Sequence, residues 1–567
     1  MQIIKSLLKF YFFIFPIFST AQSTYLPRGD KGYWIADRLD VMQPLGREIN
    51  YSALQPYNRR NMVARVEFID SLYREGVVLP NGVKFNRLTR VDQYNMEHFL
   101  LNNTEWVSGS KLSFASIKPL FKSLYVTKAN MLEVKSNDFF LVVNPILYGM
   151  IGTQKSNSER LYLNTRGLNA RGMIAGKIGF FTSVTDNQER GPKFYQQKVL
   201  DMRSVPGGGY YQNYKIRGID YFDARGYITM NAAKYIDIQF GYDKNFIGNG
   251  YRSLFLSDNA NCYLFAKLNT KIWKLNFQNL FMELESQFLQ RRDTLLDRKY
   301  AAMHHVSMNV TKWLNIGLFE GIIFGRKNHF DFQYLNPIIF YRHVEGAIGS
   351  PDNALAGIDF KANLANRFQL YGQFLLDEFN LKQVKSNNGS WSNKWGIQLG
   401  VKCMDVFGIP TLDLQLESNR VRPFTYSHRS AVANYTHYNQ LLAHPLGANF
   451  QEFIAIIHYQ PAPRWNVQAK LISYFQGLDS LDGRNLGSNP FLLYSTRKGD
   501  YGYFLGIGRQ ATCFNGLLLL SYEYKENLFV DLTAQQRNYA IGGEKGKNNS
   551  SLVSVGIRFN FIRREYE

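Results

Sequence analysis

From about residue 108 to the last residue, apolar and polar side chains alternate with a period of two. In the segment KYIDIQFGYD, for example, Ile236, Ile238 and Phe240 share one face, whereas Asp237 and Gln239 share the other. This period is typical of β-strands, because successive side chains of a strand point to opposite faces of the sheet. The same alternation is found in residues 366–379, 464–475 and 551–561, with Gly, Asn, Asp and Lys between such segments.

The chain before residue 108 has a different pattern. Apolar residues at helical spacing predict a helix within residues 57–76, with Gly76 as its stop. Thr89 is suited to cap a second helix, with Asp92 in its first turn. A third, short helix is expected in the segment IADRLDVM. We therefore expect a small helical module ahead of the strands.

The strand-rich part of the chain is expected to be all-β and to form a transmembrane antiparallel β-barrel. One face of its strands is apolar, which suits lipid, and the other carries Arg, Asp, Gln and Gly, which suits a lumen. A soluble propeller or tandem sandwiches would also alternate, but no repeat of fixed period is found. At about 25 residues for each strand with its connection, residues 108–567 predict about 16–18 strands.

The first residues have the pattern of a signal peptide. Lys5 and Lys9 supply positive charge ahead of an apolar core over residues 10–18. Residues 19–21 are small, so cleavage is expected after Ala21. A membrane anchor is the alternative, and the short apolar run disfavours it. The predicted organisation is a signal peptide (1–21), a helical periplasmic or plug module (22–107) and an outer-membrane β-barrel (108–567).

Composition adds information on partners. Aromatic residues make up 15% of the chain, a bias that suits strands and membrane interfaces. The formal net charge of +21 would attract acidic polysaccharide or the phosphates of lipopolysaccharide. The basic residues form no basic helix or zinc-finger pattern, so nucleic acid is not expected as a partner. The three cysteines, Cys262, Cys403 and Cys513, are expected to be small apolar side chains rather than disulfide partners.

Residues 418–453 form a polar, aromatic stretch between two predicted strands. Its arginines could pair with the carboxylates of an acidic sugar, its tyrosines could pack on sugar rings, and its other polar groups could bond to sugar hydroxyls. The alternative is that the stretch fills the barrel and its polar groups satisfy one another, and both can hold together. The candidate glycan-binding residues are Arg420, Arg422, Tyr426, His428, Arg429, Tyr435, His437, Tyr438, Asn439, Gln440, His444 and Asn449.

A second polar cluster consists of Tyr341, Arg342, Asp352 and Asn353. A turn would also explain the sequence Pro-Asp-Asn, because Asp and Asn side chains bond to their own backbone. We keep the four residues as further glycan-binding candidates.

Signs of catalysis are missing from the sequence. It contains no GxSxG, HExxH or P-loop motif. The adjacent Asp377 and Glu378 would lie on opposite faces of a strand, so they cannot serve one two-carboxylate site. The three histidines of the 418–453 stretch lack the spacing of zinc ligands. We expect a protein that is not an enzyme and that has no metal or cofactor.

The segment RVRPFTYSHRSAVANYTHYNQLLAHPLGANFQEF (420–453) resembles the hallmark region of Wzi-type capsule-assembly outer-membrane proteins in their Bacteroidota form, which includes gliding-motility proteins of the RemB type. Further segments resemble the family in the same order, and they are YDKNFIGNGYRSLFLSDNA (242–260), FQYLNPIIFYR (332–342), SPDNALAGIDF (350–360) and LYGQFLLDEF (370–379). The resemblance implies a barrel of about eighteen strands with a periplasmic helical bundle. It also implies a surface lectin that holds capsular polysaccharide on the outer membrane.

The leading hypothesis is therefore a non-catalytic outer-membrane barrel that binds or anchors surface polysaccharide. Its expected partners are acidic surface polysaccharide or lipopolysaccharide, and outer-membrane lipid. The alternatives are a protein that serves gliding or surface adhesins, with gliding or secretion components as partners, and a diffusion porin. An open pore would show a large conductance in lipid bilayers, and a helical plug would prevent it.

Overall fold

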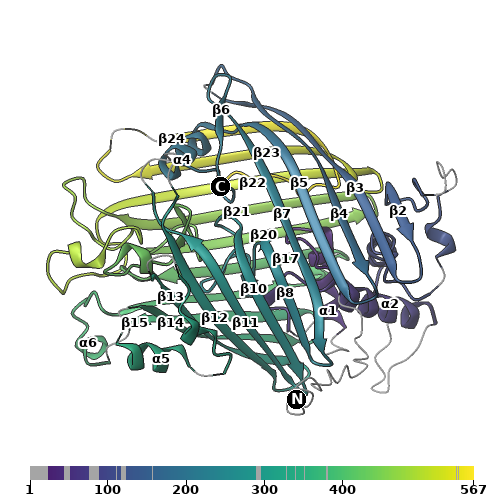
Figure 1. Ribbon diagram of the computed structural model, residues 1–567. Helices are drawn as coiled ribbons and strands as arrows, with labels where there is room; N and C mark the ends of the chain where they lie inside the picture. The colour runs from purple at the N-terminus through teal and green to yellow at the C-terminus, as the bar shows by residue number, and fades with distance from the viewer. Residues whose placement is uncertain are drawn as a thin grey trace, which may run out of the picture.

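The chain folds into one large closed barrel with a group of helices at one end (Figure 1). This computed structural model describes residues 23–43, 51–75, 88–109, 111–116, 123–155, 157–288, 295–326, 329–338, 340–349, 352–378, 381–544, 546 and 548–567. The predicted signal peptide and the predicted helix stop at Gly76 lie outside the described residues.

Eighteen of the described strands pair antiparallel, each with its neighbour in the chain, and β24 pairs with β3 to close the barrel. This confirms the predicted fold class. The barrel strands are β3 (Phe139–Gln154), β4 (Leu161–Ile174), β5 (Ile178–Arg190), β7 (Gly218–Ala233), β8 (Ile236–Asp243), β10 (Tyr263–Ile272), β11 (Leu275–Glu285), β12 (Arg298–Asn309), β13 (Leu314–Phe324), β14 (Asn353–Leu364), β15 (Phe368–Glu378), β16 (Lys394–Cys403), β17 (Leu412–Val421), β20 (Phe450–Ala462), β21 (Trp465–Leu478), β22 (Arg509–Lys525), β23 (Leu528–Ile541) and β24 (Asn548–Phe559). The short strands β2 (Leu132–Lys135) and β6 (Gln212–Tyr214) add to β3 and β7.

The apolar face of the strands points outward. On β8, Phe240 is exposed and its neighbour Gln239 is buried in the barrel. On β24, Val553, Val555 and Ile557 are all exposed. An apolar exterior around a more polar interior is the pattern of a barrel that lies in lipid, as the period of two predicted.

The helical module consists of α1 (Lys31–Met42), α2 (Arg59–Glu75) and α3 (Arg90–Leu101). Thr89 caps α3 and forms a reciprocal capping box with Asp92, which confirms the predicted helix start. A core that includes Leu39, Val66 and Phe99 joins the three helices. Among the described residues, no helix combines the length and the apolar character needed to span a membrane.

The two ends of the barrel differ. Connections of two residues, such as 273–274 between β10 and β11, lie at the end that also holds the helical module. There Lys361 of β14 pairs with Asp40 of α1 at 2.8 Å. We call this the short-turn end, and in outer-membrane barrels such an end faces the periplasm.

The opposite end, which we call the long-loop end, carries the long connections. Figure 1 shows α5 and α6 there, across the barrel from α1 and α2. Elements in these connections are α4 (Lys193–Met202), β9 (Phe246–Ile247), η3 (Phe332–Leu335), α5 (Tyr341–Ile348), α6 (Leu381–Ser386), η5 (Ala431–Ala433), β18 (Thr436–His437), β19 (Gln440–Leu441) and η6 (Tyr494–Thr496). The remaining short elements are β1 (Leu54–Gln55), η2 (Leu112–Phe114) and η4 (Val406–Gly408).

Candidate functional site

Four segments fill the barrel lumen, and we call them together the lumen plug: residues 51–57, 244–262, 422–449 and 560–567. The first comes from the helical module and the next two are loops of the long-loop end. They meet inside the barrel, where β1 pairs with β9. Gln373 of β15 donates to the carbonyl of Ile247 at 2.9 Å and so ties β9 to the wall. The lumen is therefore packed with protein.

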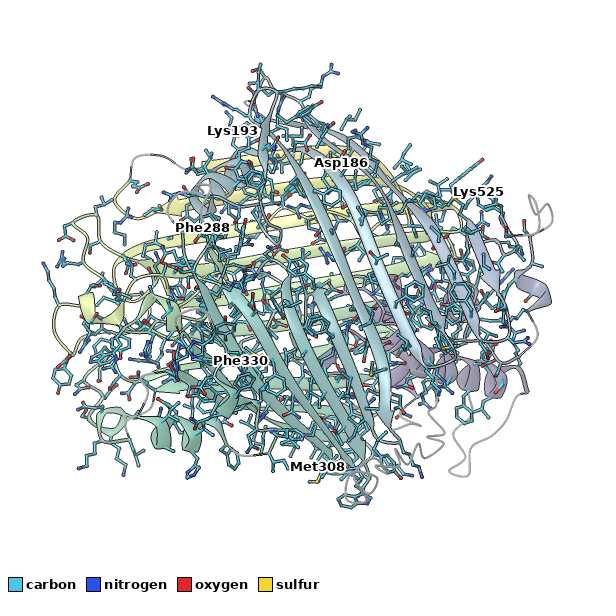
Figure 2. The ribbon with its side chains drawn as sticks, viewed as in Figure 1. Asp186, Lys193, Phe288, Met308, Phe330 and Lys525 are labelled. Carbon is cyan, nitrogen blue, oxygen red and sulfur yellow. The ribbon has the colours of Figure 1, made fainter. Side chains whose placement is uncertain are left out.

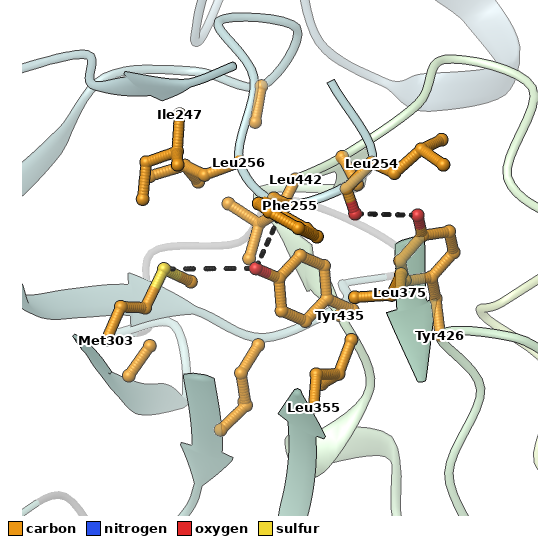
Figure 3. Packing of buried hydrophobic residues seen from close by; sticks show 14 of the residues in the cluster. Ile247, Leu254, Phe255, Leu256, Met303, Leu355, Leu375, Tyr426, Tyr435 and Leu442 are labelled. Atoms are coloured by element: carbon orange, nitrogen blue, oxygen red, sulfur yellow. Dashed lines mark hydrogen bonds between the residues drawn. The ribbon is translucent and has the colours of Figure 1, made fainter. Parts of the chain in front are cut away.

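Two tyrosines of the 422–449 loop hold it against the 244–262 loop (Figure 3). The Tyr426 hydroxyl donates to the carbonyl of Leu254 at 2.8 Å, and the Tyr435 hydroxyl donates to the carbonyl of Phe255 at 2.6 Å. Both side chains are 1% exposed and belong to the apolar cluster of the lumen. Their rings are not available to a ligand in this structure.

The amide side chains of the same loop are also occupied by backbone groups. Asn439 donates to the carbonyls of Met202 and Phe288 at 3.1 and 2.9 Å. Gln440 donates to the carbonyl of Gly208 at 2.8 Å and accepts from the amide of Gly207 at 2.7 Å. These bonds join three connections of the long-loop end in one network.

Asn449 makes the equivalent contacts at the end of the loop. Its side chain donates to the carbonyls of Gly477 and Ile507 at 2.7 and 2.8 Å, and it accepts from the amide of Gly506 at 2.7 Å. Every polar atom of this amide is thus used within the protein. The alternative that the loop satisfies its own polar groups describes these residues well.

The three histidines of the loop lie in separate hydrogen-bonded sites. The Nδ1 of His437 lies 3.1 Å from the amide nitrogen of Glu285 and 3.0 Å from its carboxylate, and Nε2–H donates to the carbonyl of Cys262 at 3.0 Å. Burial lowers the pKa of His437 to about 3 and that of His428 to about 4. Burial also lowers the pKa of His444, against the opposing effect of Glu452 at 2.7 Å. Neutral, hydrogen-bonded histidines are structural members of the plug.

The arginines and Tyr438 differ in their environments. Arg422 donates to the carbonyls of Asn393 and Tyr503 at 2.9 Å each, so it holds neighbouring loops together. Tyr438 is buried against Phe288. Arg420 lies on the outward face of β17 beside Trp395, at 6.0 Å from its ring, and not with the loop residues. Arg429 is exposed at the long-loop end.

Tyr341, Arg342 and Asp352 of the second predicted cluster lie on the outer side of the barrel wall, whereas Asn353 faces the lumen beside Ile323. Tyr341 of α5 stacks on the outward-facing His304 of β12, with ring centroids 3.9 Å apart. Asp352 is held by Arg326 at 2.5 and 2.8 Å and by the Tyr334 hydroxyl at 2.8 Å. Asn353 begins β14 and is buried, whereas Arg342 is exposed. The structure therefore places Tyr341 and Arg342 apart from the 422–449 loop, on the opposite side of the wall.

Residues 560–567 turn back from the short-turn end into the lumen. Lys470 of β21 contacts Glu565 and lies 2.6 Å from Glu567. Arg252 pairs with Glu567 at 2.9 Å. Burial alone would raise the pKa of Glu567, but Arg252 and Lys470 hold that pKa well below its ordinary value. Tyr566 packs in a cluster with Tyr195 of α4, so the tail reaches the long-loop end.

A group of residues at the long-loop end forms what we call the rim patch: Trp391, His428, Arg429, Tyr494 and Arg497. Sequence reasoning named His428 and Arg429 but missed Trp391, Tyr494 and Arg497. The Trp391 and Tyr494 rings lie 4.7 Å apart, and the Arg497 guanidinium lies 3.7 Å above the Trp391 ring. His428 meets the edge of Tyr494 at 5.7 Å. These residues come from three different loops, and aromatic residues beside basic ones in loops were the available signal.

The rim patch combines the groups that sugar recognition needs. Trp391 and Tyr494 are half-buried rather than buried, so their rings can take part in stacking against the apolar face of a sugar. Arg429 beside them offers a guanidinium that can bind a carboxylate with two parallel hydrogen bonds.

Comparison with known proteins fits this geometry. Residues 222–489 match the family model described as capsule assembly protein Wzi. Over these residues, which make up just under half of the chain, the sequence is similar to the Wzi family. The matched region includes the 244–262 and 422–449 loops of the lumen plug and most of the rim patch. A comparison with curated proteins finds no match.

Among solved structures, Wzi of Escherichia coli has a similar fold. That structure is described as an outer-membrane protein involved in group 1 capsule assembly and as a carbohydrate-binding β-barrel. It has 12% sequence identity and a TM-score of 0.56, and the match covers 95% of this chain and 99% of that one. At this identity the likeness supports the fold. The protein is an outer-membrane β-barrel.

Two proteins of other bacteria with known structures are also similar. OprD of Pseudomonas aeruginosa has 11% identity and a TM-score of 0.41, with 74% of this chain and 94% of that one covered. OccAB2 of Acinetobacter baumannii has 8% identity and a TM-score of 0.42, with 74% and 97% covered. Scores this low carry no argument about function.

Proposed function

We propose that the protein is a lectin-like barrel that binds surface polysaccharide at its long-loop end and acts in capsule assembly without catalysis. The observation that carries the proposal is the Wzi-family match over residues 222–489, which includes Trp391, His428 and Arg429 of the rim patch. The carbohydrate binding described for Escherichia coli Wzi supports it. We propose acidic polysaccharide as the ligand, because the rim patch and the whole chain are basic.

The packed lumen supports a binding role over a porin role. Tyr426, Tyr435 and His437 are buried in the lumen, and the helical module lies across the short-turn end. A polymer or a solute would have to displace these contacts to pass. A role with gliding or secretion components stays a prediction from the sequence resemblance.

The glycan contacts are proposed at the rim patch. Arg429 is the exposed member and is proposed to pair with a sugar carboxylate, while Trp391 and Tyr494 pack against the ring. The buried members of the 422–449 loop are proposed to shape this surface from below. In this arrangement Asn439 and Gln440 position the loops and do not touch the glycan.

The first test uses a deletion strain of the producing bacterium, in which cell-attached and released surface polysaccharide are compared. Release without loss of total synthesis supports the proposal, and the wild-type gene should restore attachment. Unchanged attachment would contradict it.

The second test assigns the contact to the rim patch. Arg429→Ala should weaken binding of purified protein to the polysaccharide by about 1.5–3 kcal/mol, or roughly 10- to 150-fold in Kd, the worth of a hydrogen bond to a charged group. Trp391→Ala should weaken it by a smaller factor. Trp465→Ala is the matched control, because Trp465 also pairs with a tyrosine at 4.7 Å but lies at the short-turn end. Equal loss in Trp391→Ala and Trp465→Ala would contradict the assignment.

A further inference from the structure

The outer wall of the barrel is covered at one place where lipid would be expected. On β13, outward-facing residues alternate with residues that face the lumen. One of the outward-facing residues, Leu318, is 51% exposed. Towards the long-loop end of the same strand face, Ile322 and Phe324 are 0% exposed. Tyr300 and Ala302 on the outward face of β12 are buried as well. A segment of protein must therefore lie on the outside of the wall here.

That segment is the connection between β13 and β14, which folds down over the wall instead of into the lumen. Tyr334 and Tyr341 from this loop join the buried cluster of Tyr300, Ile322 and Phe324. Phe330, labelled in Figure 2, packs its ring 5.1 Å from that of Phe324. The Arg326–Asp352 ion pair holds the two stems of the loop together.

A carboxylate on the outer wall shows that this cover is a fixed part of the fold. Glu320 points outward from β13, where a bare carboxylate would face lipid at a high cost in free energy. Its two oxygens accept from the backbone amides of Tyr341 and Arg342 at 2.9 and 3.0 Å, at the start of α5. Glu320 lies four residues below the end of β13, so the loop reaches roughly 13 Å down the strand.

The other side of the loop is apolar and has no protein partner in the described residues. Phe332 is 79% exposed, Ile338 81% and Phe340 72%. These side chains belong to the same loop that covers the outward, lipid-facing side of β12 and β13. Arg342, beside them on α5, has a side chain that is 75% exposed, and a guanidinium pairs well with phosphate.

We propose that the β13–β14 loop is a lipid-binding element of the barrel exterior. Phe332, Ile338 and Phe340 lie among the acyl chains of the outer leaflet, and Arg342 lies at the level of the anionic headgroups. The occupant is lipid because the loop lies on the lipid-facing side of the wall and combines apolar side chains with a cation at its edge. This inference does not depend on polysaccharide binding.

Spin labels distinguish lipid from water at this loop. Ile338→Cys and Phe340→Cys, in a Cys403→Ser background that leaves only the buried Cys262 and Cys513, are labelled with a nitroxide. The full-length protein is placed in vesicles of phosphatidylcholine and phosphatidylglycerol. Accessibility to oxygen, which concentrates in acyl chains, is compared with accessibility to a water-soluble nickel chelate. Leu481→Cys is the control, because Leu481 is equally exposed at 81% but lies in the β21–β22 loop.

Spin labels at positions 338 and 340 should be more accessible to oxygen than to the nickel chelate, and the label at position 481 should be more accessible to the nickel chelate. Dominance of the nickel chelate at 338 and 340 would overturn the proposal. Low accessibility to both reagents would also overturn it, and would indicate a second copy of the chain on this face. A measurement on the wild-type protein guards against misfolded variants: lipids with a photoreactive acyl chain should attach to the peptide that contains residues 330–349, and attachment only elsewhere on the barrel would contradict the proposal.

Discussion

Replacing Arg38 by Met tests how the helical module is held at the short-turn end. The Arg38 guanidinium is buried between three carboxylates, with N–O distances of 2.6 Å to Asp92, 2.9 Å to Asp405 and 2.7 Å to Asp413. Asp92 belongs to α3, whereas the other two belong to the barrel. A Met side chain can fill part of the volume, but it leaves the carboxylates without their cation.

The expected loss follows from these contacts. Removing one partner of a buried ion pair costs about 3–5 kcal/mol. A second estimate comes from proton uptake, because an unpaired buried carboxylate can become neutral by binding a proton. Protonating a carboxylate of pKa about 3.9 at pH 7 costs about 1.36 × 3, or roughly 4 kcal/mol, so one unpaired carboxylate cannot cost more than this. The two values agree. The loss should shrink as the pH falls towards about 4, because the carboxylates are then protonated in the unfolded chain as well.

Urea unfolding in detergent micelles provides the assay. Trp34 is a suitable fluorescent probe, because its indole N–H donates to Asp413 at 2.9 Å. Arg74→Met is the matched control: Arg74 also contacts two carboxylates, at 2.8 and 2.7 Å, but its side chain is 50% exposed, so about 0.2–1 kcal/mol is expected. Equal losses in the two variants at neutral pH, or a loss in Arg38→Met that grows as the pH falls, would refute the reasoning.

Two further predictions concern the lumen plug. Lys470→Met should release residues 560–567, because it removes the buried cation between Glu565 and Glu567. Amide hydrogen exchange of residues 560–567 should therefore become faster. The control Lys402→Met, which breaks a Lys–Asp pair at α1, should leave that exchange unchanged. His437→Gln should flatten the pH dependence of stability. Folded His437 has a pKa of about 3, so the wild type loses stability as the pH falls from about 6.5 towards 3, by up to about 1.4 kcal/mol for each pH unit. The dependence of stability on pH is measured from urea unfolding midpoints at several pH values. A His437→Gln variant that loses stability with falling pH as steeply as the wild type would contradict the prediction. A weaker pH dependence in the control His343→Gln, whose side chain is exposed, would contradict it as well.

Much of the fold could be predicted because each local pattern has one physical cause. The alternation on β8 and β24 is imposed by lipid on one side of a strand and protein on the other. Thr89 and Asp92 satisfy each other at a helix start without any help from distant residues. Such signals are complete within a few residues of sequence, so no tertiary contact is needed to interpret them.

The candidate site was harder to predict because exposure depends on distant parts of the chain. Tyr426 and Arg429 are three residues apart, yet Tyr426 is buried by its bond to Leu254 and Arg429 is exposed. The sequence places Tyr341 among the candidate glycan ligands because its neighbours are polar, but its loop lies outside the barrel wall. The period of a strand cannot show on which side of the wall a connecting loop folds.

The pairing of β1 with β9 has a mechanical consequence. A polymer held at the long-loop end would pull on the 422–449 loop, and Tyr426 and Tyr435 would pass that tension to residues 254–255. From there the strain runs through β9 into β1, and through the helical module into the far rim of the barrel at Arg38. Tension applied outside the cell would thus be borne along the whole length of the barrel, and the loops would not carry it alone.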